Sequence, residues 1–363
     1  MNILVTGRYE PDYNRTRILL NGLRARGVSV TESPYERKRD WDPAGFFRQT
    51  GHFDLVFLPS FTHRDVRFIK RQLDLPLVFD PLISRYLSKV FDYKKVWPYS
   101  PRAWKNFLKD QRAMKAADVV LADTEAHRNY YIRRIGIDPH KIFVVPVGVD
   151  TSEYLPSVKP FKRGEVIVGF YGSYIPLHGI HKIIEAAALL KDEKHIRFEL
   201  VGDGVLRKQA ETLVRKLSAA NITFTGRVPY QELPQMIDRF DICLGIFGDS
   251  AKAKMVIPNK IYHYCARGKP VLTMPSPAID EIFENNRDIF TTDPSPRAMA
   301  DAITYLVNHP EKSKEVALQG MKRVRDGFNE DAIAGKFLEA ARFACSVATQ
   351  RMMNAPTLWR VVL

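Results

Sequence analysis

The sequence predicts an α/β protein with two doubly wound parallel-sheet domains, and three observations lead to this prediction. Short apolar runs alternate with amphipathic helical segments along the chain, as expected for parallel sheets covered by helices on both faces. The pattern starts twice with a strand that enters a glycine turn, at NILVTG (2–7) and VIVGFYG (166–172). The 363 residues are enough for two domains of ordinary size.

The remaining strands and helices follow from the same alternation. In the first half, apolar runs that predict strands stand at 55–60, 76–80, 118–124 and 141–148. In the second half they stand at 198–204, 222–226, 241–248 and 269–275. Segments with helical periodicity lie between these runs, among them 17–27, 106–118, 181–190 and 231–240.

Domain boundaries are expected where the pattern is interrupted. Residues 149–165 carry the Pro, Ser and charged residues typical of a linker. We therefore expect a first domain over 1–155 and a second over 156–330. A long helical pattern fills much of 331–363, and we expect this segment to cross back toward the first domain.

Composition favours a cytoplasmic protein without a metal site. Cys243, Cys265 and Cys345 are scattered and lack metal-ligand spacing, so they are expected to pack as small apolar residues in a reducing compartment. No leader pattern precedes the first strand, and no apolar run is long enough to cross a bilayer. HExxH, P-loop and GxSxG motifs are absent, which disfavours metalloprotease, P-loop NTPase and serine hydrolase functions.

The basic charge points to a phosphate-rich partner. The formal net charge is +14, and residues 64–115 hold 13 basic against 5 acidic residues. Within 84–110 the basic residues alternate with Tyr, Phe and Trp, which suits the interface of an anionic membrane. A pair of ordinary amphipathic helices explains the same aromatics. Nucleic acid is not an expected partner, because charge alone supports it and no reading motif is present.

Strand ends of the second half supply the first candidate binding residues. Gly172 follows a strand and permits close backbone approach, while Ser173 and His178 offer donors to a phosphate at a helix N-terminus. A tight turn with a surface histidine is the alternative. Gly202 and Asp203 follow the next strand, but the third glycine of a dinucleotide fingerprint is missing. Asp203 is equally well explained as a helix cap.

The loop 245–260 brings further positive charge to the same region. Lys252, Lys254 and Lys260 lie close to a helix start formed by Pro258 and Asn259. Each lysine alone is an ordinary surface residue. Three of them beside a helix N-terminus, at the carboxyl end of a parallel sheet, favour an anion site.

Strand ends of the first half supply a second set of candidates. Arg8 and Arg15 lie near the first helix, where they meet an acceptor or a phosphate or remain exposed. Asp80 directly follows a strand, which suits a general base or a residue that orients a hydroxyl, and a helix cap fits equally well. Asp123 has the same two explanations.

Taken together, the chain resembles the retaining glycosyltransferases of family 4, which have the GT-B fold of two Rossmann-like domains facing across a cleft. The resemblance rests on PVGVDTSEYLP, GFYGSYIPLHGIHKIIEAA, FELVGDG, ITFTGRVPYQELPQMIDRFDICLGIF and IPNKIYHYCARGKPVLTMPSPAIDEIF, in the family's order.

The resemblance implies the substrates and the chemistry. It implies a nucleotide-diphosphate sugar, such as a UDP-, GDP- or dTDP-sugar, held mainly by the second domain. The acceptor, a glycan or a lipid-linked molecule, would bind mainly to the first. Transfer would proceed with retention and without a metal ion or other cofactor. Lys260, Asp80 and His178 are the candidate catalytic residues, and basic side chains would stabilise the departing diphosphate.

The sequence departs from the family pattern at the donor site. Met255 and His263 occupy the positions of the family's two glutamates, and Ser173 and His178 those of its Arg/Lys pair. His263 could hydrogen-bond the ribose in place of the second glutamate. Lys252 and Lys260 could supply the missing charge.

The resulting expectation is a glycosyltransferase of cell-surface glycan synthesis, such as lipopolysaccharide or exopolysaccharide, acting at the cytoplasmic membrane face. A catalytically inactive sugar-nucleotide-binding scaffold and a sugar-nucleotide epimerase of the same fold are the alternatives.

Overall fold

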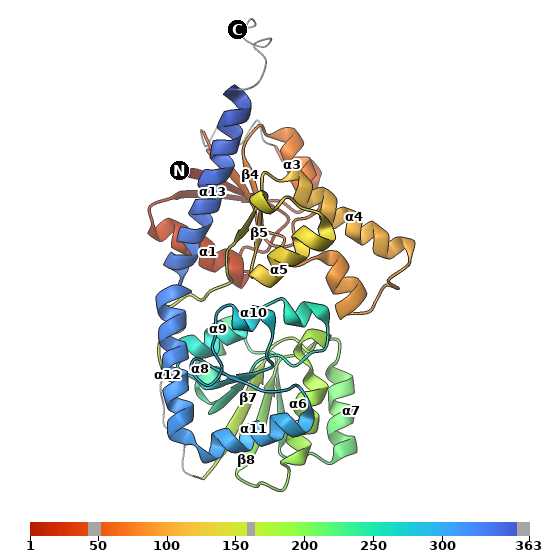
Figure 1. Cartoon of the computed structure of the whole chain (residues 1–363), viewed down its shortest axis with the longest axis vertical. Coiled ribbons are helices and arrows are strands. Elements are labelled where there is room, and N and C mark those ends of the chain that lie inside the picture. The colour runs from red at the N-terminus through yellow and green to blue at the C-terminus, as the bar shows by residue number, and fades with distance from the viewer. Residues whose placement is uncertain (43–51, 158–163, 354–363) are drawn as a thin grey trace, which may run out of the picture. The chain divides into compact units, whose positions relative to one another are not determined.

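The computed structural model describes residues 1–42, 52–157 and 164–353, which form two compact units, each built on a six-stranded parallel sheet (Figure 1). The first unit contains residues 1–86, 99–146 and the chain from Asp331 onward. The second contains 87–98 and 147–330. The chain thus enters the second unit twice. Part of the expected linker 149–165 and the last ten residues of 331–363 lie outside the described residues.

The sheet of the first unit has the strand order β2-β1-β3-β4-β5-β6. Its strands are β1 (Asn2–Gly7), β2 (Ser29–Pro34), β3 (Leu55–Leu58), β4 (Leu77–Phe79), β5 (Val119–Ala122) and β6 (Ile142–Val144). The central strands β3, β4 and β5 are fully buried, which is why they appear in the sequence as continuous apolar runs. Strand β2 lies at the edge and is only half-buried.

Helices cover this sheet and complete its core. They are α1 (Asn14–Ala25), α3 (Val66–Gln72), α4 (Pro101–Ala116), α5 (Glu125–Tyr130) and α13 (Glu330–Met353), with short 3-10 or π-helical turns at Lys38–Asp40, Tyr131–Ile135 and Pro139–Lys141. Ser100 caps α4 by accepting a hydrogen bond from the backbone of Ala103, and Pro101 follows it. The C-terminal helix α13 packs into this core, where Phe337 meets Phe57 edge to face at 4.9 Å.

The sheet of the second unit has the strand order β12-β11-β10-β7-β8-β9. Its strands are β7 (Val166–Tyr171), β8 (Ile196–Val201), β9 (Ile222–Gly226), β10 (Ile242–Leu244), β11 (Val271–Thr273) and β12 (Phe290–Thr291). Counted from β7, this is the strand order of the dinucleotide-binding Rossmann fold. The predicted class of two doubly wound parallel sheets is therefore confirmed.

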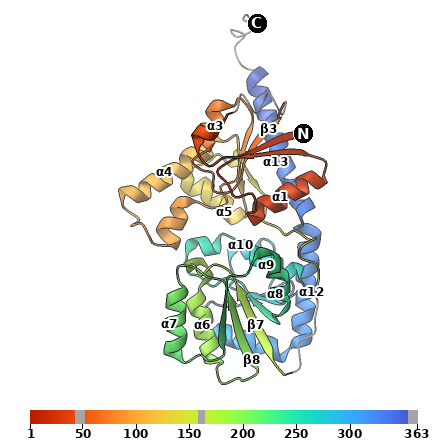
Figure 2. The same cartoon turned by 180° about the vertical axis from the view of Figure 1, so that it is seen from behind.

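The helices of the second unit are distributed around its sheet. They are α6 (Ile180–Leu189), α7 (Arg207–Leu217), α8 (Leu233–Asp238), α9 (Asn259–Ala266), α10 (Pro277–Asp280), α11 (Pro296–Asn308) and α12 (Pro310–Gly327). Short turns lie at Leu87–Asp92, Pro176–His178, Tyr230–Glu232 and Ala251–Lys254. Both views show α6 and α7 side by side along strands β7 and β8 (Figure 2).

Each sheet has a point where the strand order reverses. It lies between β1 and β3 in the first unit and between β7 and β10 in the second. Ligands of open α/β sheets bind outside the carboxyl ends of the strands at such points. The loops after β1 and β3, and those after β7 and β10, are therefore the places where binding residues are expected.

Two further findings bear on the expected class of protein. Within the described ranges, no helix combines the length and apolar character that a membrane span requires. Over the same residues, no group of three or more His, Cys, Asp or Glu side chains is arranged to hold a metal ion. Cys243 and Cys265 are buried free thiols, and Cys345 is a partly exposed one.

Candidate functional site

Lys260 is a buried amine without a hydrogen-bond partner among the described residues. It lies in the first turn of α9, and the residue is only 3% exposed. Its Nζ has no acceptor and lies 3.7 Å from the centroid of the Phe170 ring. Burial lowers the pKa of Lys260 well below its usual value. The cation–π contact compensates only part of the desolvation, so a ligand that brings negative charge would stabilise this amine.

Gly172 lies against this amine. Its φ of +149° is a conformation that glycine adopts easily. A Cβ at this position would lie 2.8 Å from Lys260 Nζ. The end of the neighbouring strand β8 also leaves no room for a side chain, because a Cβ on Gly202 would lie 2.0 Å from the carbonyl oxygen of Gly172. The two glycines thus allow the loops after β7 and β8 to touch backbone to backbone.

The close approach of these loops predicts a large effect of Gly202→Ala. We expect this substitution to lower the free energy of unfolding by about 2–4 kcal/mol, because it adds a φ of +123° for alanine to a direct clash with backbone. Gly226→Ala is the matched control, since Gly226 also has positive φ, +80°, but has no atom within 4 Å of the added Cβ. Urea unfolding measures both variants. Equal losses would show that the loop contact contributes nothing.

His178 is a neutral imidazole beside Lys260. The ring is buried, and its Nδ1 is hydrogen-bonded to the carbonyl oxygen of Ser173. A carbonyl only accepts, so Nδ1 carries the proton and Nε2 keeps its lone pair. Burial and then the charge of Lys260 lower the pKa of His178 well below its usual value, with a smaller contribution from Lys252. The alternative explanation of His178 as a surface histidine is wrong, and Ser173 is the exposed member of this pair.

Lys252 reaches the same region but is already paired. Its Nζ lies 3.4 Å from Asp92 Oδ2, and both side chains are buried. Asp92 belongs to the segment 87–98, which the chain contributes to the second unit between two elements of the first. Lys254, in contrast to Lys252, is exposed. Of these three lysines, Lys260 is therefore the one that is buried without a hydrogen-bonding partner among the described residues.

His263 lies one turn beyond Lys260 on α9 and is engaged within the protein. Its Nδ1 is 2.6 Å from the hydroxyl of Tyr171, and its ring stacks on Tyr154 at 3.9 Å between centroids. The residue is 1% exposed. A direct bond from His263 to a ribose would therefore require these contacts to change. No sequence pattern singles out Tyr154 or Tyr171, because an isolated tyrosine resembles any other core residue.

A pocket of about 320 Å³ opens at the carboxyl ends of β7 and β8. It is lined by Tyr171, Gly172, Ser173, Gly202, Asp203 and Arg227, among others.

Asp203 is exposed, and its Oδ1 accepts a hydrogen bond from the backbone of Gly204 at 2.7 Å. The helix-cap explanation of Asp203 is wrong, because α7 begins at Arg207 and no side chain caps it. Pro258 and Asn259, at the start of α9, are both partly exposed.

In the first unit, Arg15 and Asp80 form a buried ion pair. Arg15 Nε lies 2.5 Å from Asp80 Oδ2, and both residues are at most 3% exposed. The other carboxylate oxygen accepts a hydrogen bond from the backbone of Leu82 at 2.9 Å. No described helix begins at Asp80, so the helix-cap explanation is wrong. Arg15 Nη1 and Nη2 are buried without a hydrogen-bond partner in the described residues, and they are available to a polar ligand.

Asp123 belongs to the same buried region. Its Oδ1 lies 2.6 Å from His127 Nδ1, and its charge acts on Arg15. Thr124, the next residue, is the true cap of α5 and accepts a hydrogen bond from the backbone of His127. Tyr131 lies beside Asp123 and Asp80 with a fully buried hydroxyl that has no partner in the described part of the chain. Sequence analysis missed His127 and Tyr131.

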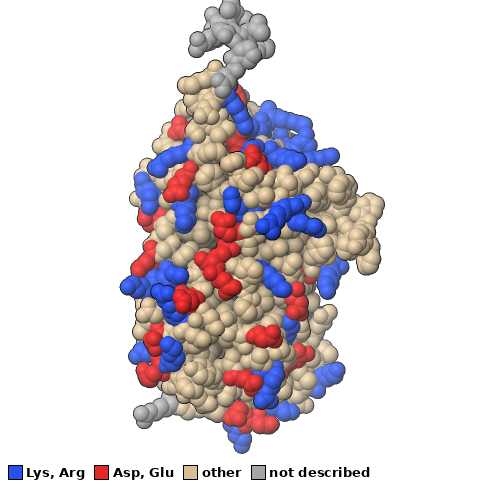
Figure 3. All heavy atoms as spheres, in the orientation of Figure 1, with Lys and Arg blue, Asp and Glu red and all other residues tan. Residues whose placement is uncertain are grey.

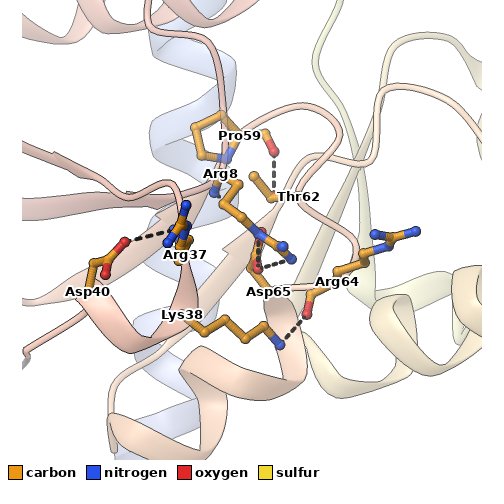
Figure 4. A network of polar contacts seen from close by, with 8 residues as sticks. All are labelled: Arg8, Arg37, Lys38, Asp40, Pro59, Thr62, Arg64 and Asp65. Atoms are coloured by element: carbon orange, nitrogen blue, oxygen red, sulfur yellow. Dashed lines mark hydrogen bonds and ion pairs between the residues drawn. The ribbon is translucent and has the colours of Figure 1, made fainter.

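Arg8 follows β1, and its side chain is held by Asp65. Its Nε and Nη2 donate to the carboxylate at 2.9 and 2.6 Å (Figure 4). The candidate residues of the first unit therefore fall in two places. Arg15, Asp80 and Asp123 lie together, and Arg8 lies with Asp65 at the reversal between β1 and β3.

Family models match both halves of the chain. Residues 14–153 match the model described as Glycosyltransferase Family 4, and residues 181–356 match the model described as Glycosyl transferase-like. Among relatives, the MMP alpha-(1->4)-mannosyltransferase of Mycolicibacterium hassiacum is 20% identical over 243 residues. The alignment covers 65% of this chain and 56% of that relative, so it spans little more than half of the relative's length.

Solved structures share the fold over nearly the whole chain. The sucrose-phosphate synthase of Thermosynechococcus elongatus has a TM-score of 0.76 at 15% identity. The alignment covers 96% of this chain and 100% of the synthase chain. HepE of Anabaena in complex with UDP-glucose has a TM-score of 0.71 at 17% identity. The alignment covers 94% of this chain and 99% of the HepE chain. At these identities the likeness concerns the fold. The family models over the two halves and the shared fold together support a glycosyltransferase with the GT-B fold.

Proposed function

We propose that the protein transfers a sugar from a nucleotide-diphosphate donor to a glycan or lipid-linked acceptor, with retention of configuration. The observation that carries this proposal is the buried amine of Lys260, which has no hydrogen-bond partner in the described part of the chain and lies against Gly172, a residue that lines the pocket at the ends of β7 and β8. A diphosphate is the group that such an arrangement would attract, since the N-terminus of α9 adds the positive end of its dipole.

The chemistry that follows is electrostatic stabilisation of the leaving group. As the bond between sugar and diphosphate breaks, negative charge grows on the diphosphate, and a protonated Lys260 in a water-poor site would stabilise it. The neutral His178 supplies an acceptor at Nε2 that could orient a sugar or phosphate hydroxyl. These groups would do what a metal ion does in other transferases, so we propose that transfer is metal-independent.

The donor and acceptor are proposed by class. HepE, which shares the fold, was solved with UDP-glucose, and the related protein from M. hassiacum is named a mannosyltransferase. UDP-, GDP- and dTDP-sugars are therefore the donors to examine. We propose that Gly202, Asp203, Pro258 and Asn259 hold the nucleotide, and that Arg8, Arg15 and Asp123 lie on the acceptor side.

We further propose a role at the cytoplasmic face of a membrane, in the synthesis of a cell-surface glycan such as lipopolysaccharide or exopolysaccharide. Three large aromatics are well exposed, namely Trp97 at 71%, Tyr99 at 89% and Trp104 at 60%. Basic side chains gather over α3 on the face drawn in Figure 3, and α4 carries Arg102, Lys105, Lys109, Arg112 and Lys115. Exposed Trp and Tyr beside Lys and Arg are the groups that favour the interface of an anionic bilayer.

A second candidate is a sugar-nucleotide-binding protein without transferase activity. In its favour, Met255 and His263 occupy the positions at which the family resemblance places two glutamates, and His263 is hydrogen-bonded to Tyr171. An epimerase of the same fold is a third candidate. Product analysis with and without an added acceptor separates these functions, because an epimerase converts its sugar nucleotide when no acceptor is present.

The donor site is tested by a thermal-shift screen against UDP-, GDP- and dTDP-sugars. At a concentration one hundred times Kd, a bound donor is expected to stabilise the folded protein by about 2.7 kcal/mol. The free nucleoside monophosphates serve as controls, since they lack the leaving diphosphate. Absence of a shift with every sugar nucleotide would contradict the proposed function.

A further inference from the structure

The first unit carries a concentration of positive charge at its strand-order reversal that the donor chemistry does not use. Arg8 follows β1, Arg37 and Lys38 follow β2, and Arg64 follows β3. We name these four residues the basic cradle. All four side chains come from the carboxyl ends of neighbouring strands, where an open α/β sheet binds its ligands.

Local contacts bring the cradle together. Arg8 is fixed on the buried carboxylate of Asp65, and Lys38 Nζ donates to the carbonyl oxygen of Arg64 at 2.9 Å (Figure 4). Gly7 makes the approach of the β1 and β3 loops possible. Its φ is +111°, and a Cβ there would lie 2.9 Å from Thr62 Cγ2. The cradle is therefore held by specific contacts between three loops.

The carboxylates nearby do not balance this charge. Asp65 engages Nε and Nη2 of Arg8, which leaves Nη1 for another acceptor. The side chain of Arg8 is 32% exposed, so a ligand can reach it. The Asp40 carboxylate accepts a hydrogen bond from the backbone N–H of Arg37 and forms an ion pair with Arg39. Among the described residues it forms no ion pair with the guanidinium of Arg37.

Arg85 adds a like charge next to the cradle. Burial and then the charge of Arg64 lower the pKa of Arg85, which means that the two guanidiniums repel one another. Arg85 Nε is buried without a hydrogen-bond partner among the described residues. An anion placed between such groups would relieve the repulsion and supply the missing acceptor.

We propose that the basic cradle binds a phosphate group of the acceptor substrate. A phosphate offers three oxygens to the planar forks of the arginines, whereas a carboxylate offers two, and four cationic side chains come from the loops at this strand-order reversal. The proposal deepens the proposed function, because it names the acceptor as a phosphorylated molecule. The phosphate could belong to a lipid headgroup or to a soluble phosphorylated polyol, and both present the same chemistry to the cradle.

Binding of phosphate probes to the full chain tests the proposal without any turnover. The probes are inorganic phosphate, glycerol 3-phosphate, and phosphatidylcholine vesicles with and without phosphatidic acid, all at low ionic strength. Arg37→Gln and Arg64→Gln each remove one exposed cradle charge, so the fold should persist. We expect each to weaken phosphate binding about tenfold. Arg215→Gln, which removes an exposed charge from α7 in the second unit, is expected to leave binding unchanged.

The outcomes separate this proposal from the donor site. Loss of soluble-phosphate binding in the cradle variants supports a soluble acceptor, and a loss seen only with phosphatidic acid vesicles supports a lipid headgroup. Equal losses in Arg215→Gln, no binding of any probe, or a loss in Lys260→Met without one in the cradle variants would overturn the proposal. UDP-glucose binding should be unchanged in Arg37→Gln and Arg64→Gln. If the cradle binds phosphate but no sugar nucleotide binds, the proposed function fails and the cradle stands.

Discussion

Lys260→Met is expected to stabilise the ligand-free protein while abolishing donor-dependent turnover. The amine is 3% exposed with no hydrogen-bond partner among the described residues, so its burial costs about 1–3 kcal/mol that a methionine of similar length would recover. The same change removes the charge proposed to stabilise the departing diphosphate. Urea unfolding and nucleoside diphosphate release measure the two effects. Lys254→Met is the control, because Lys254 is exposed and neither quantity should change.

The pH dependence of stability should report the same lysine. Burial lowers the pKa of Lys260 in the folded state, so the unfolded chain binds this proton more readily. The free energy of unfolding attributable to Lys260 therefore rises with pH, from its lowered pKa up to its usual value near 10.5. Lys260→Met should lose this rise. Donor binding should take up a proton and weaken at higher pH. A Lys260→Met protein that is less stable, or turns over normally, would contradict this account.

Asp80→Ala is expected to destabilise the first unit by about 3–5 kcal/mol, because it leaves the buried guanidinium of Arg15 without its closest counter-charge. It also removes the acceptor of the Leu82 backbone N–H. Urea unfolding measures the loss, and Asp74→Ala, at an exposed acid of the same unit, should be neutral. The double variant Arg15→Met/Asp80→Leu should recover most of the stability, since no charge is then left unpaired.

The double variant also separates structure from catalysis at this pair. If Asp80 serves only to hold Arg15, activity should return with stability. If Asp80 or Arg15 contacts the acceptor, the double variant should be stable and inactive, with donor binding unchanged. We expect the second result, because Arg15 Nη1 and Nη2 have no hydrogen-bond partner among the described residues. Full activity in the double variant would remove both residues from the acceptor site.

Most of the fold was predictable because buried parallel strands have a clear sequence pattern. The apolar runs in the sequence correspond to β1, to β3 through β6, and to β7 through β11. Two strands were missed for physical reasons. Strand β2, SVTESP, lies at an edge and is mostly half-exposed, so it needs no apolar run. Strand β12 has only two residues, and no periodicity can identify so short an element.

The site was predictable only as far as the strand-end rule extends. That rule predicted Gly172, Lys260, Arg15 and Asp80 as candidates, but it says nothing about which of them meet. Arg15 and Asp80 pair across 65 residues of chain, and Lys260 meets Gly172 from a different loop. Such contacts depend on tertiary packing, which a single sequence does not reveal. The inclusion of residues 87–98 in the second unit is a further case.

The basic cradle could be predicted from the sequence only in part. Arg8 was a candidate because it follows the first strand, whereas Arg37 follows the strand that the sequence did not predict. Without β2, the charges of Arg37 and Lys38 look like an exposed run on a polar loop. Only the strand order places them beside Arg8 and Arg64.

The most direct test of the central claim is the release of nucleoside diphosphate from UDP-, GDP- and dTDP-sugars, followed with a panel of phosphorylated and lipid-linked acceptors. The account predicts acceptor-dependent release that is present in the wild type and in Lys254→Met and is lost in Lys260→Met, with the sugar recovered on the acceptor in its original anomeric configuration. Tight donor binding without turnover on any acceptor, or conversion of one sugar nucleotide into another without an acceptor, would contradict it.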